Sequence, residues 1–242
     1  IQVQNHQSAA LLNTVGYNNT VIAGDTRVDR VLALAASAPV NEKVATFTKG
    51  DSPVFIAGSS WEADENVFLP VLKKASFRHL LLIIAPHDPS ERNVERLMAE
   101  APGPVRYSEY DADKHRECRT LIIDNVGMLN TLYRYAHIAW IGGGFGKSIH
   151  NTLEPAAYGL PLIYGPAYRH FEEAVQFAAR GGAIVVRDST GFETALSTLL
   201  RPGDRTQASG AVLGYLSASK GATDTAMRWF MHQTGAGSKQ KE

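Results

Sequence analysis

The sequence predicts an α/β protein in which a mostly parallel, doubly wound sheet is covered by helices on both faces. Short runs rich in Val, Ile and Leu have the length of buried parallel strands. Between them lie helix-length segments with apolar residues at three- and four-residue spacing. Because strand and helix alternate regularly, crossover connections are required, and the expected sheet is Rossmann-like.

The elements follow one another in pairs, each strand before its helix. The strands are expected at 53–58, 79–86, 120–124, 136–144, 160–166 and 183–186. The helices are expected at 61–75, 89–101, 126–136, 151–159, 170–182 and 189–200. These elements belong to a predicted domain that spans residues 25–233.

The two ends are expected to differ from this domain. Residues 1–24 are interpreted as one helix and one strand, the end of a missing N-terminal domain with its linker. Two final helices, at 205–219 and 222–233, have no strand between them and are expected to pack outside the sheet. The polar segment 234–242 is predicted to be a disordered tail.

Composition and charge narrow the class of protein. The chain has 242 residues, 44% of them hydrophobic and 20% charged, which is enough to bury a full core. Lys and Arg total 24, as do Asp and Glu, so no net charge attracts nucleic acid or an anionic membrane. We therefore expect no nucleic-acid partner.

Cysteine content and the first residues indicate the compartment and the completeness of the chain. Cys118 is the only cysteine, which excludes an intramolecular disulfide and a Cys-rich zinc site and fits the cytoplasm. No apolar run is long enough to span a membrane. The chain starts at Ile1 without an initiator Met or a signal pattern, so we expect a fragment.

A glycine-rich segment, "IGGGFGKSIHNTLEP", lies where a ligand is expected. Ligands of open parallel sheets bind at the carboxyl ends of the strands. Gly142, Gly143 and Gly144 end a predicted strand there, and their amides could face an anion. Asn151 is a candidate N-cap of the next helix, whose first amides would offer an anion site.

Charged side chains accompany these glycines. Lys147 and His150 could add positive charge beside a phosphate, and Glu154 could accept from two vicinal hydroxyls of a ribose. The same segment also fits a tight strand-to-helix turn in which Glu154 only favours the helix start. The residues alone leave both interpretations open.

Two other strand ends carry candidate phosphate contacts. Ser59 and Ser60 could donate to a phosphate, or one of them could cap the helix that follows. His87 lies in a loop with prolines at 86 and 89. It could contact phosphate or transfer a proton, or it could belong to a simple surface loop.

A further strand is expected to end at Asp124 and Asn125, and the backbone of Gly127 and Met128 after it could meet a base edge or could open a helix. Two common nucleotide motifs are absent from the sequence. No G-x-G-x-x-G stands in the position of a dinucleotide fingerprint. "GGGFGKS" is not a phosphate-binding P-loop, because Ile141 occupies the place of the first glycine.

Taken together, the motifs resemble the C-terminal half of the 3-deoxy-D-manno-octulosonic acid (Kdo) transferases of bacterial lipopolysaccharide synthesis. The resemblance spans roughly residues 8 to 200. It is carried by "GDTRVDRV", "FIAGSSWEADE", "IIAPHDP", "IIDNVGML", "HFEEA" and, most specifically, "LYRYAHIAWIGGGFGKSIHNTLEPAAYGLPLIYGP".

This resemblance implies one half of a GT-B glycosyltransferase, a pair of Rossmann-like domains with the active site between them. The C-terminal domain would bind CMP-Kdo. The N-terminal domain would bind the lipid A precursor, contact the membrane and supply the catalytic base, so no catalytic residue is expected in this chain. The implied donor contacts are Gly127 and Met128 at the cytosine, Glu154 at the ribose, and Ser59, Ser60, His150 and Asn151 near the phosphate.

One motif departs from the family pattern. Many members carry Pro-Arg-His-Pro where this chain has Pro-His-Asp-Pro at 86–89, so the arginine is missing. Lys147, Arg27 or Arg169 would then supply the charge at the phosphate. The implied reaction inverts the anomeric carbon, releases CMP, and needs no metal or cofactor.

The resemblance also implies a location and leaves rivals. The whole protein would lie at the cytoplasmic face of a Gram-negative inner membrane, whereas this chain alone would be soluble and inactive. The alternatives are another GT-B glycosyltransferase, a sugar-nucleotide epimerase-like enzyme, or a non-catalytic nucleotide-binding module.

Overall fold

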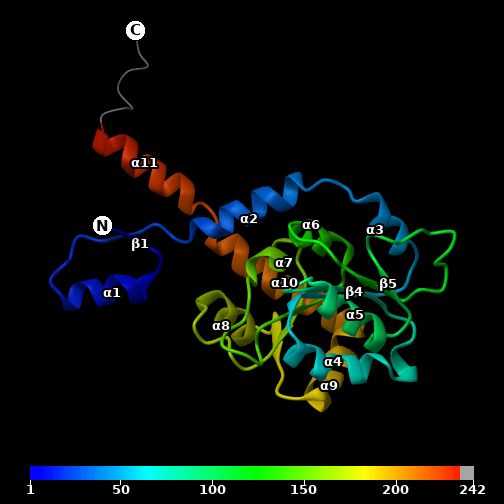
Figure 1. Ribbon diagram of the computed structural model, residues 1–242. Helices are drawn as coiled ribbons and strands as arrows, with labels where there is room; N and C mark the ends of the chain where they lie inside the picture. The colour runs from blue at the N-terminus through cyan, green and yellow to red at the C-terminus, as the bar shows by residue number, and fades with distance from the viewer. Residues whose placement is uncertain (235–242) are drawn as a thin grey trace, which may run out of the picture.

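The computed structural model describes residues 1–234 and contains a main sheet of seven parallel strands in the order β5-β6-β4-β3-β7-β8-β9 (Figure 1). The strands are β3 (Val54–Ser60), β4 (Leu81–Pro86), β5 (Pro104–Arg106), β6 (Thr120–Ile122), β7 (Ile138–Ile141), β8 (Leu162–Tyr164) and β9 (Ala183–Val185). All adjacent pairs are parallel. The predicted α/β class, Rossmann-like and doubly wound, is confirmed.

Helices cover both faces of this sheet (Figure 1). The helices after residue 24 are α2 (Thr26–Ser37), α3 (Glu42–Phe47), α4 (Glu62–Leu72), α5 (Glu91–Glu100), α6 (Leu129–Leu132), α7 (Leu153–Ala157), α8 (Glu172–Ala179), α9 (Ser189–Leu200), α10 (Pro202–Ser219) and α11 (Ala222–Thr234), of which α11 lies away from the sheet. Single 3-10 turns lie at Ala75–Phe77 and Tyr133–Tyr135.

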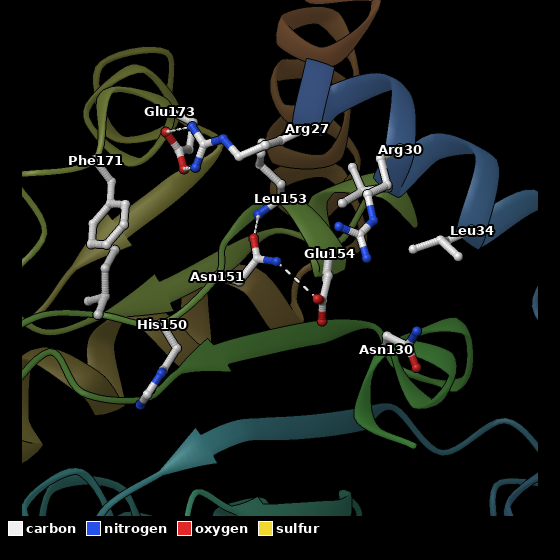
Figure 2. Close-up of a pocket in the computed structure, with 12 residues that line it drawn as sticks. Arg27, Arg30, Leu34, Asn130, His150, Asn151, Leu153, Glu154, Phe171 and Glu173 are labelled. Carbon is white, nitrogen blue, oxygen red and sulfur yellow. Dashed lines mark hydrogen bonds and ion pairs between the residues drawn. The ribbon is translucent and has the colours of Figure 1, made fainter. Parts of the chain in front are cut away.

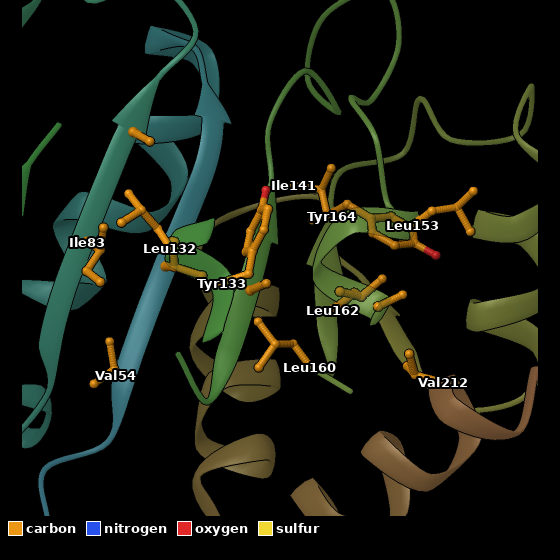
Figure 3. Close-up of a cluster of buried hydrophobic side chains, with 14 of the residues drawn as sticks. Val54, Ile83, Leu132, Tyr133, Ile141, Leu153, Leu160, Leu162, Tyr164 and Val212 are labelled. Carbon is orange, nitrogen blue, oxygen red and sulfur yellow. The ribbon is translucent and has the colours of Figure 1, made fainter. Parts of the chain in front are cut away.

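The core has two halves, one on each face of the sheet. Along β3, Val54 and Ile56 join one cluster, and Phe55 and Ala57 join the other, because successive side chains of a strand point to opposite faces. Figure 3 shows the first cluster, in which β strands meet Leu132, Tyr133 and Val212. Burying one large apolar side chain is worth about 1.5–3 kcal/mol, so a register slip along β3 would be costly.

The order of the strands creates a switch point beside β3. The chain adds β4, β6 and β5 on one side of β3 and then returns to its other side with β7, β8 and β9. Loops after β3 and β7 therefore diverge and leave a crevice at the carboxyl edge of the sheet. This crevice is where the predicted glycine-rich segment lies.

The structure differs from the sequence prediction in several elements. Helices α2 and α3 and the edge strand β5 were not predicted; β5 has only three residues and starts at a proline. Helix α10, expected outside the sheet, packs against α7, α8 and α9, and its Val212 and Leu216 are buried in the core. Helix α11 contacts α2 where both helices begin, and there the Asp29 carboxylate accepts from the amides of Gly221 and Thr223, both at 2.7 Å.

Residues 1–24 form a small unit of their own. It comprises β1 (Gln2–Val3), α1 (His6–Thr14) and β2 (Val21–Ile22), and its two strands pair in parallel, separately from the main sheet. The predicted helix and strand are confirmed, with β1 in addition. In Figure 1 this unit and α11 extend to one side of the sheet domain. Its origin in a further domain stays a prediction.

The predicted tail 234–242 begins at Thr234, the last residue of α11, and otherwise lies outside the described residues. Within the part of the chain that the structure describes, we find no helix with both the length and the apolar character needed to cross a bilayer.

Candidate functional site

A cavity of about 520 Å³ opens on the β7 side of the switch point, between α2 and the segment that leads into α7 (Figure 2). Basic, acidic and amide side chains share its wall with apolar ones. The polar residues that line it are Arg27, Arg30, Asn130, His150, Asn151, Glu154 and Glu173. Three of them, His150, Asn151 and Glu154, were predicted as donor-binding residues.

Asn151 organises the start of α7. Its Oδ1 accepts from the amide of Leu153 at 3.0 Å, and its Nδ2 donates to Oε1 of Glu154 at 2.9 Å. The expectation that Asn151 is the N-cap is wrong: the cap is Thr152, whose side chain makes no capping hydrogen bond, and Asn151 lies one residue earlier. Helix α7 begins at Leu153 and has only five residues instead of the predicted nine. So short a helix, with one amide already bonded, makes a weak anion site. The binding chemistry therefore rests on side chains.

Glu154 points into the cavity, where Asn151 fixes its carboxylate (Figure 2). Burial raises the pKa of Glu154, while the hydrogen bond from Asn151 and the nearby charge of Arg30 act in the opposite direction. In the part of the chain described, Asn151 is the only hydrogen-bond partner of this carboxylate, which keeps further acceptor capacity for a ligand.

The cations near the cavity differ in whether they already have an ion-pair partner. Arg27 pairs with Asp25 at 2.6 Å and with Glu173 at 3.2 Å, and these partners raise its pKa. Arg30, one turn further along α2, faces Glu154 across the cavity (Figure 2). The guanidinium of Arg169 lies over the ring of Tyr168, 5.6 Å from its centroid, and does not line the cavity. Arg30 thus joins the cations predicted to serve the phosphate.

The amides of the glycine-rich turn are not free. The amide of Gly142 donates to the carbonyl of Gly58 at 2.9 Å, and that of Gly143 donates to Oδ2 of Asp64 at 2.8 Å. The expectation that these amides face a ligand is therefore wrong for both residues. Their contact with the donor by other atoms stays a prediction.

The same glycines allow close backbone contacts. A Cβ on Gly142 would lie 1.9 Å from the carbonyl oxygen of Ser59, and one on Gly144 would lie 2.4 Å from the amide nitrogen of Gly165. Real Cβ atoms do not approach so closely. The turn needs glycine because β3 and the loop after β8 pack directly against its backbone.

Asp64 accepts a backbone hydrogen bond from this turn. Its side chain is fully buried, and Oδ2 also accepts from the amide of Trp61 at 3.0 Å, so it caps α4 and anchors Gly143 together. Burial raises the pKa of Asp64, and the two donating amides oppose that shift. This role of Asp64 was not predicted, since an acidic residue in a first helical turn has an ordinary explanation.

Ser59 and Ser60 have different environments. The hydroxyl of Ser60 is buried and donates to Oε1 of Glu65 at 2.7 Å, so neither the capping role nor a free hydroxyl applies to it. Arg96 pairs with the same Glu65. Ser59 has a φ of +52° where the register between β3 and β4 is irregular. A non-glycine residue in this conformation is uncommon and marks a shaped turn.

Three rings from the ends of three adjacent strands stack on one another. The ring centroid of His87 lies 4.3 Å from that of Trp61 and 4.5 Å from that of His150. The indole N–H of Trp61 donates to Nε2 of His150 at 3.0 Å. Burial and the neighbouring His87 lower the pKa of His150. The neutral ring therefore carries its proton on Nδ1, which is left as a donor.

Asn125, Gly127 and Met128 do not line the cavity, although Asn130 in the same segment does. Gly127 has a φ of +91° and an exposed backbone, and Met128 precedes α6. Their contact with a base stays a prediction. Within residues 1–234, no three His, Cys, Asp or Glu side chains are grouped so that they could hold a metal ion.

Sequence comparisons identify several 3-deoxy-D-manno-octulosonic acid transferases as relatives of this chain. No protein-family model matches the chain. A 3-deoxy-D-manno-octulosonic acid transferase of Chlamydophila psittaci is 28% identical over 153 residues, which cover 62% of this chain and 35% of that protein. The one from Bordetella pertussis is 27% identical over 233 residues, covering 92% of this chain and 54% of its own length. The chain thus spans about half or less of these curated relatives.

Solved structures match the fold. The C-terminal CMP-Kdo binding domain of WaaA from Acinetobacter baumannii aligns with a TM-score of 0.62 and 22% identity, covering 78% of this chain and 98% of that one. A UDP-N-acetylglucosamine 2-epimerase aligns with a TM-score of 0.60 and 11% identity over 99% of this chain and 58% of that one. The resemblance predicted from the motifs is confirmed: the chain is related in sequence to the Kdo transferases and has a fold like that of the CMP-Kdo binding domain of WaaA.

Proposed function

We propose that this chain is the donor-binding part of a Kdo transferase, and that it holds CMP-Kdo for transfer of Kdo to a lipid A precursor. The sequence similarity to Kdo transferases supports the family of reaction. The observation that carries the proposal is the Glu154 carboxylate, fixed by Asn151 and facing a cavity between α2 and the segment after β7. Such a carboxylate is suited to two vicinal ribose hydroxyls.

The donor would lie along the carboxyl edge of the sheet. Its ribose would donate to Glu154, and its phosphate would accept from Nδ1–H of His150 and from the second N–H of the Asn151 amide. Arg30 would contribute positive charge from α2, where Arg27 is already paired with two carboxylates. These N–H groups and the charge of Arg30 are in place before CMP-Kdo binds. They would therefore stabilise the negative charge that grows on the departing phosphate.

The transfer step is the displacement expected of this class. A hydroxyl oxygen of the acceptor attacks the anomeric carbon of Kdo, the bond from that carbon to the phosphate oxygen breaks, and CMP leaves with the electron pair. The configuration inverts, and the proton of the hydroxyl passes to a base outside this chain. In this proposal no metal takes part, and the acceptor and membrane contacts belong to a further domain at the cytoplasmic face of the inner membrane. This chain alone would bind donor without transferring Kdo.

One rival function has an observation in its favour. The fold also matches a UDP-N-acetylglucosamine 2-epimerase over nearly the whole chain. A UDP-sugar enzyme or a nucleotide-binding module without catalysis would use the same cavity with a different base. The identity of the base therefore decides among these functions.

A panel of CMP, UDP, GDP and ADP tests the proposal. The melting temperature of the chain is measured with each nucleotide at the same concentration, and the ligand with the highest affinity gives the largest rise. At 100 times its Kd a ligand adds about 2.7 kcal/mol to the free energy of unfolding. We expect CMP to give the largest shift. A larger shift with UDP would favour the rival, and no shift with any nucleotide would contradict the proposal.

A further inference from the structure

His150 separates the cavity of Glu154 from a second hollow of about 300 Å³. This second hollow, here called the Lys147 hollow, is lined by Trp61, Ala63, Gly143, Gly146, Lys147, Ser148 and His150. None of these residues is acidic, and Lys147 is the one cation among them. The two spaces follow one another along the carboxyl edge of the sheet.

The order of side chains along this edge matches the order of groups in the donor. Glu154 suits the ribose, and His150, at the boundary between the spaces, suits the phosphate. The group that follows the phosphate in a nucleotide sugar is the sugar itself. It would enter the Lys147 hollow, where Kdo, as a sugar acid, would bring a carboxylate.

We infer that the Lys147 hollow is the subsite for the sugar acid of the donor, with Lys147 binding its carboxylate and Trp61 contacting its ring. This inference rests on the proposed function, and it assigns Lys147 to the sugar instead of the phosphate. A lysine ammonium beside a carboxylate forms a charge-assisted hydrogen bond. Nothing acidic in the hollow competes for it.

Charge at Lys147 is available for this role. Among residues 1–234, Lys147 has no ion-pair or hydrogen-bond partner, and its side chain is exposed. Arg27, by contrast, is held by Asp25 and Glu173. The unpaired ammonium of Lys147 is therefore free to swing to a carboxylate held at the mouth of the Lys147 hollow.

Trp61 provides a flat wall whose position is fixed. One face of the indole stacks on His87, at an interplanar angle of 26°, and its N–H is bonded to His150. The side chain is nevertheless 45% exposed. An ordered and exposed aromatic face of this kind packs well against the C–H groups of a sugar ring, because little side-chain entropy is lost on binding.

Calorimetric titration of the chain with CMP and with CMP-Kdo tests the inference. The quantity of interest is the ratio of the two affinities, which reports the sugar alone. We expect CMP-Kdo to bind more tightly than CMP. Lys147→Met should lower the affinity for CMP-Kdo about tenfold and leave that for CMP within about twofold. Lys114→Met, an exposed lysine that lines neither space, is the matched control and should change neither affinity.

Trp61 is tested by a pair of variants. Trp61→Leu should lower the ratio several-fold, whereas Trp61→Phe should keep most of it, because phenylalanine retains a flat face. Both variants lose the hydrogen bond to His150, so the difference between them reports the aromatic face. Unchanged affinity for CMP shows that the cavity of Glu154 is intact in either variant.

Several results would overturn the inference. If both affinities are unchanged in Lys147→Met, Lys147 does not bind the sugar. If the affinities for CMP and CMP-Kdo fall equally, Lys147 binds the phosphate instead. A wild-type chain that binds both ligands equally would overturn the subsite and leave the proposed function standing. A chain that binds neither ligand would contradict the proposed function, and the subsite with it.

Discussion

The glycine-rich turn at 142–144 follows β7, and the segment 150–154 leads into α7. The two regions have different roles, one structural and one suited to binding a ligand. In the turn, polar backbone groups bond to the protein itself, through Gly58 and Asp64. In the following segment, the side chains of His150, Asn151 and Glu154 face a cavity. The many glycines are therefore explained by close packing of the backbone. The groups that can bind a ligand are the side chains of the following segment, which this packing holds in position.

The cost of burying unpaired amides explains why the turn and the following segment differ. A buried amide without a hydrogen-bond partner costs about 1–3 kcal/mol, so the turn can exist without ligand only because Asp64 and Gly58 accept its amides. The side chains of the next segment are only partly buried and keep capacity for a partner. The turn is thus a scaffold, which substitutions at Gly142 and Asp64 test, whereas a substitution at Trp61 tests the segment that follows it.

The largest effect is expected at Gly142. In Gly142→Ala the new Cβ would have to occupy a point 1.9 Å from the carbonyl oxygen of Ser59, so β3 or β7 must move. We expect a loss of about 3 kcal/mol or more in the free energy of unfolding, measured by denaturant titration. Gly146→Ala is the matched control, because its Cβ would meet only the Gly143 carbonyl at 3.5 Å. Equal stability of the two variants would contradict the scaffold role.

A smaller effect is expected at Asp64. Asp64→Ala leaves the amides of Gly143 and Trp61 without their acceptor and should lower the free energy of unfolding by about 2 kcal/mol. Glu62→Ala, an exposed acidic residue in the same first turn of α4, controls for lost helix-dipole interaction. If both variants lose the same few tenths of a kcal/mol, Asp64 is an ordinary helix-start residue.

The smallest effect is expected from Trp61→Phe, which keeps a ring beside His87 and removes the donor to Nε2 of His150. We expect the pKa of His150 to rise, because Nε2 becomes free to bind a proton, and to stay below its ordinary value, because burial and His87 are unchanged. An NMR titration of the imidazole resonances, assigned with His150→Gln, measures this shift. Trp229→Phe, on α11, is the control. An unchanged His150 pKa would show that the indole does not set its protonation.

The same variant has a consequence for stability. Since the folded chain holds the pKa of His150 below that of the unfolded chain, the unfolded state takes up the proton first as the pH falls through 6.5. This residue therefore contributes stability above pH 6.5 that is lost on acidification. In Trp61→Phe that loss should shrink, by about 1 kcal/mol at most.

Hydrophobic runs and their spacing were enough to predict the sheet. The strands at 53–58 and 79–86 and the helix at 189–200 were found where predicted, because buried strands and amphipathic helices impose their own periodicity. The strand β5 was missed, since three residues starting at Pro104 have no such period. Helix α2, which supplies Arg30 to the cavity, was not predicted, although its first residues belong to the motif "GDTRVDRV".

The site was predictable in part. Asn151 and Glu154 stand at a strand-to-helix turn whose composition indicated a cap and an acceptor, and the structure brings both to the cavity. The bond from Asp64 to Gly143 joins residues 79 positions apart, so no local pattern could reveal it. Stacking of Trp61 with His87 and His150 likewise depends on the order of strands in the sheet.

Titration of CMP into the wild-type chain, Glu154→Gln and Glu154→Asp tests most directly whether the side chains after the turn bind the nucleotide. The amide of Gln replaces one acceptor by a donor, and Asp draws the carboxylate back by about 1.5 Å, beyond good hydrogen-bond range. We expect both variants to lose about 1.5–3 kcal/mol of binding, roughly ten- to a hundredfold in affinity, with melting temperatures close to that of the wild type. Unchanged affinity together with a lower melting temperature in Glu154→Gln would show that Glu154 only supports the start of α7.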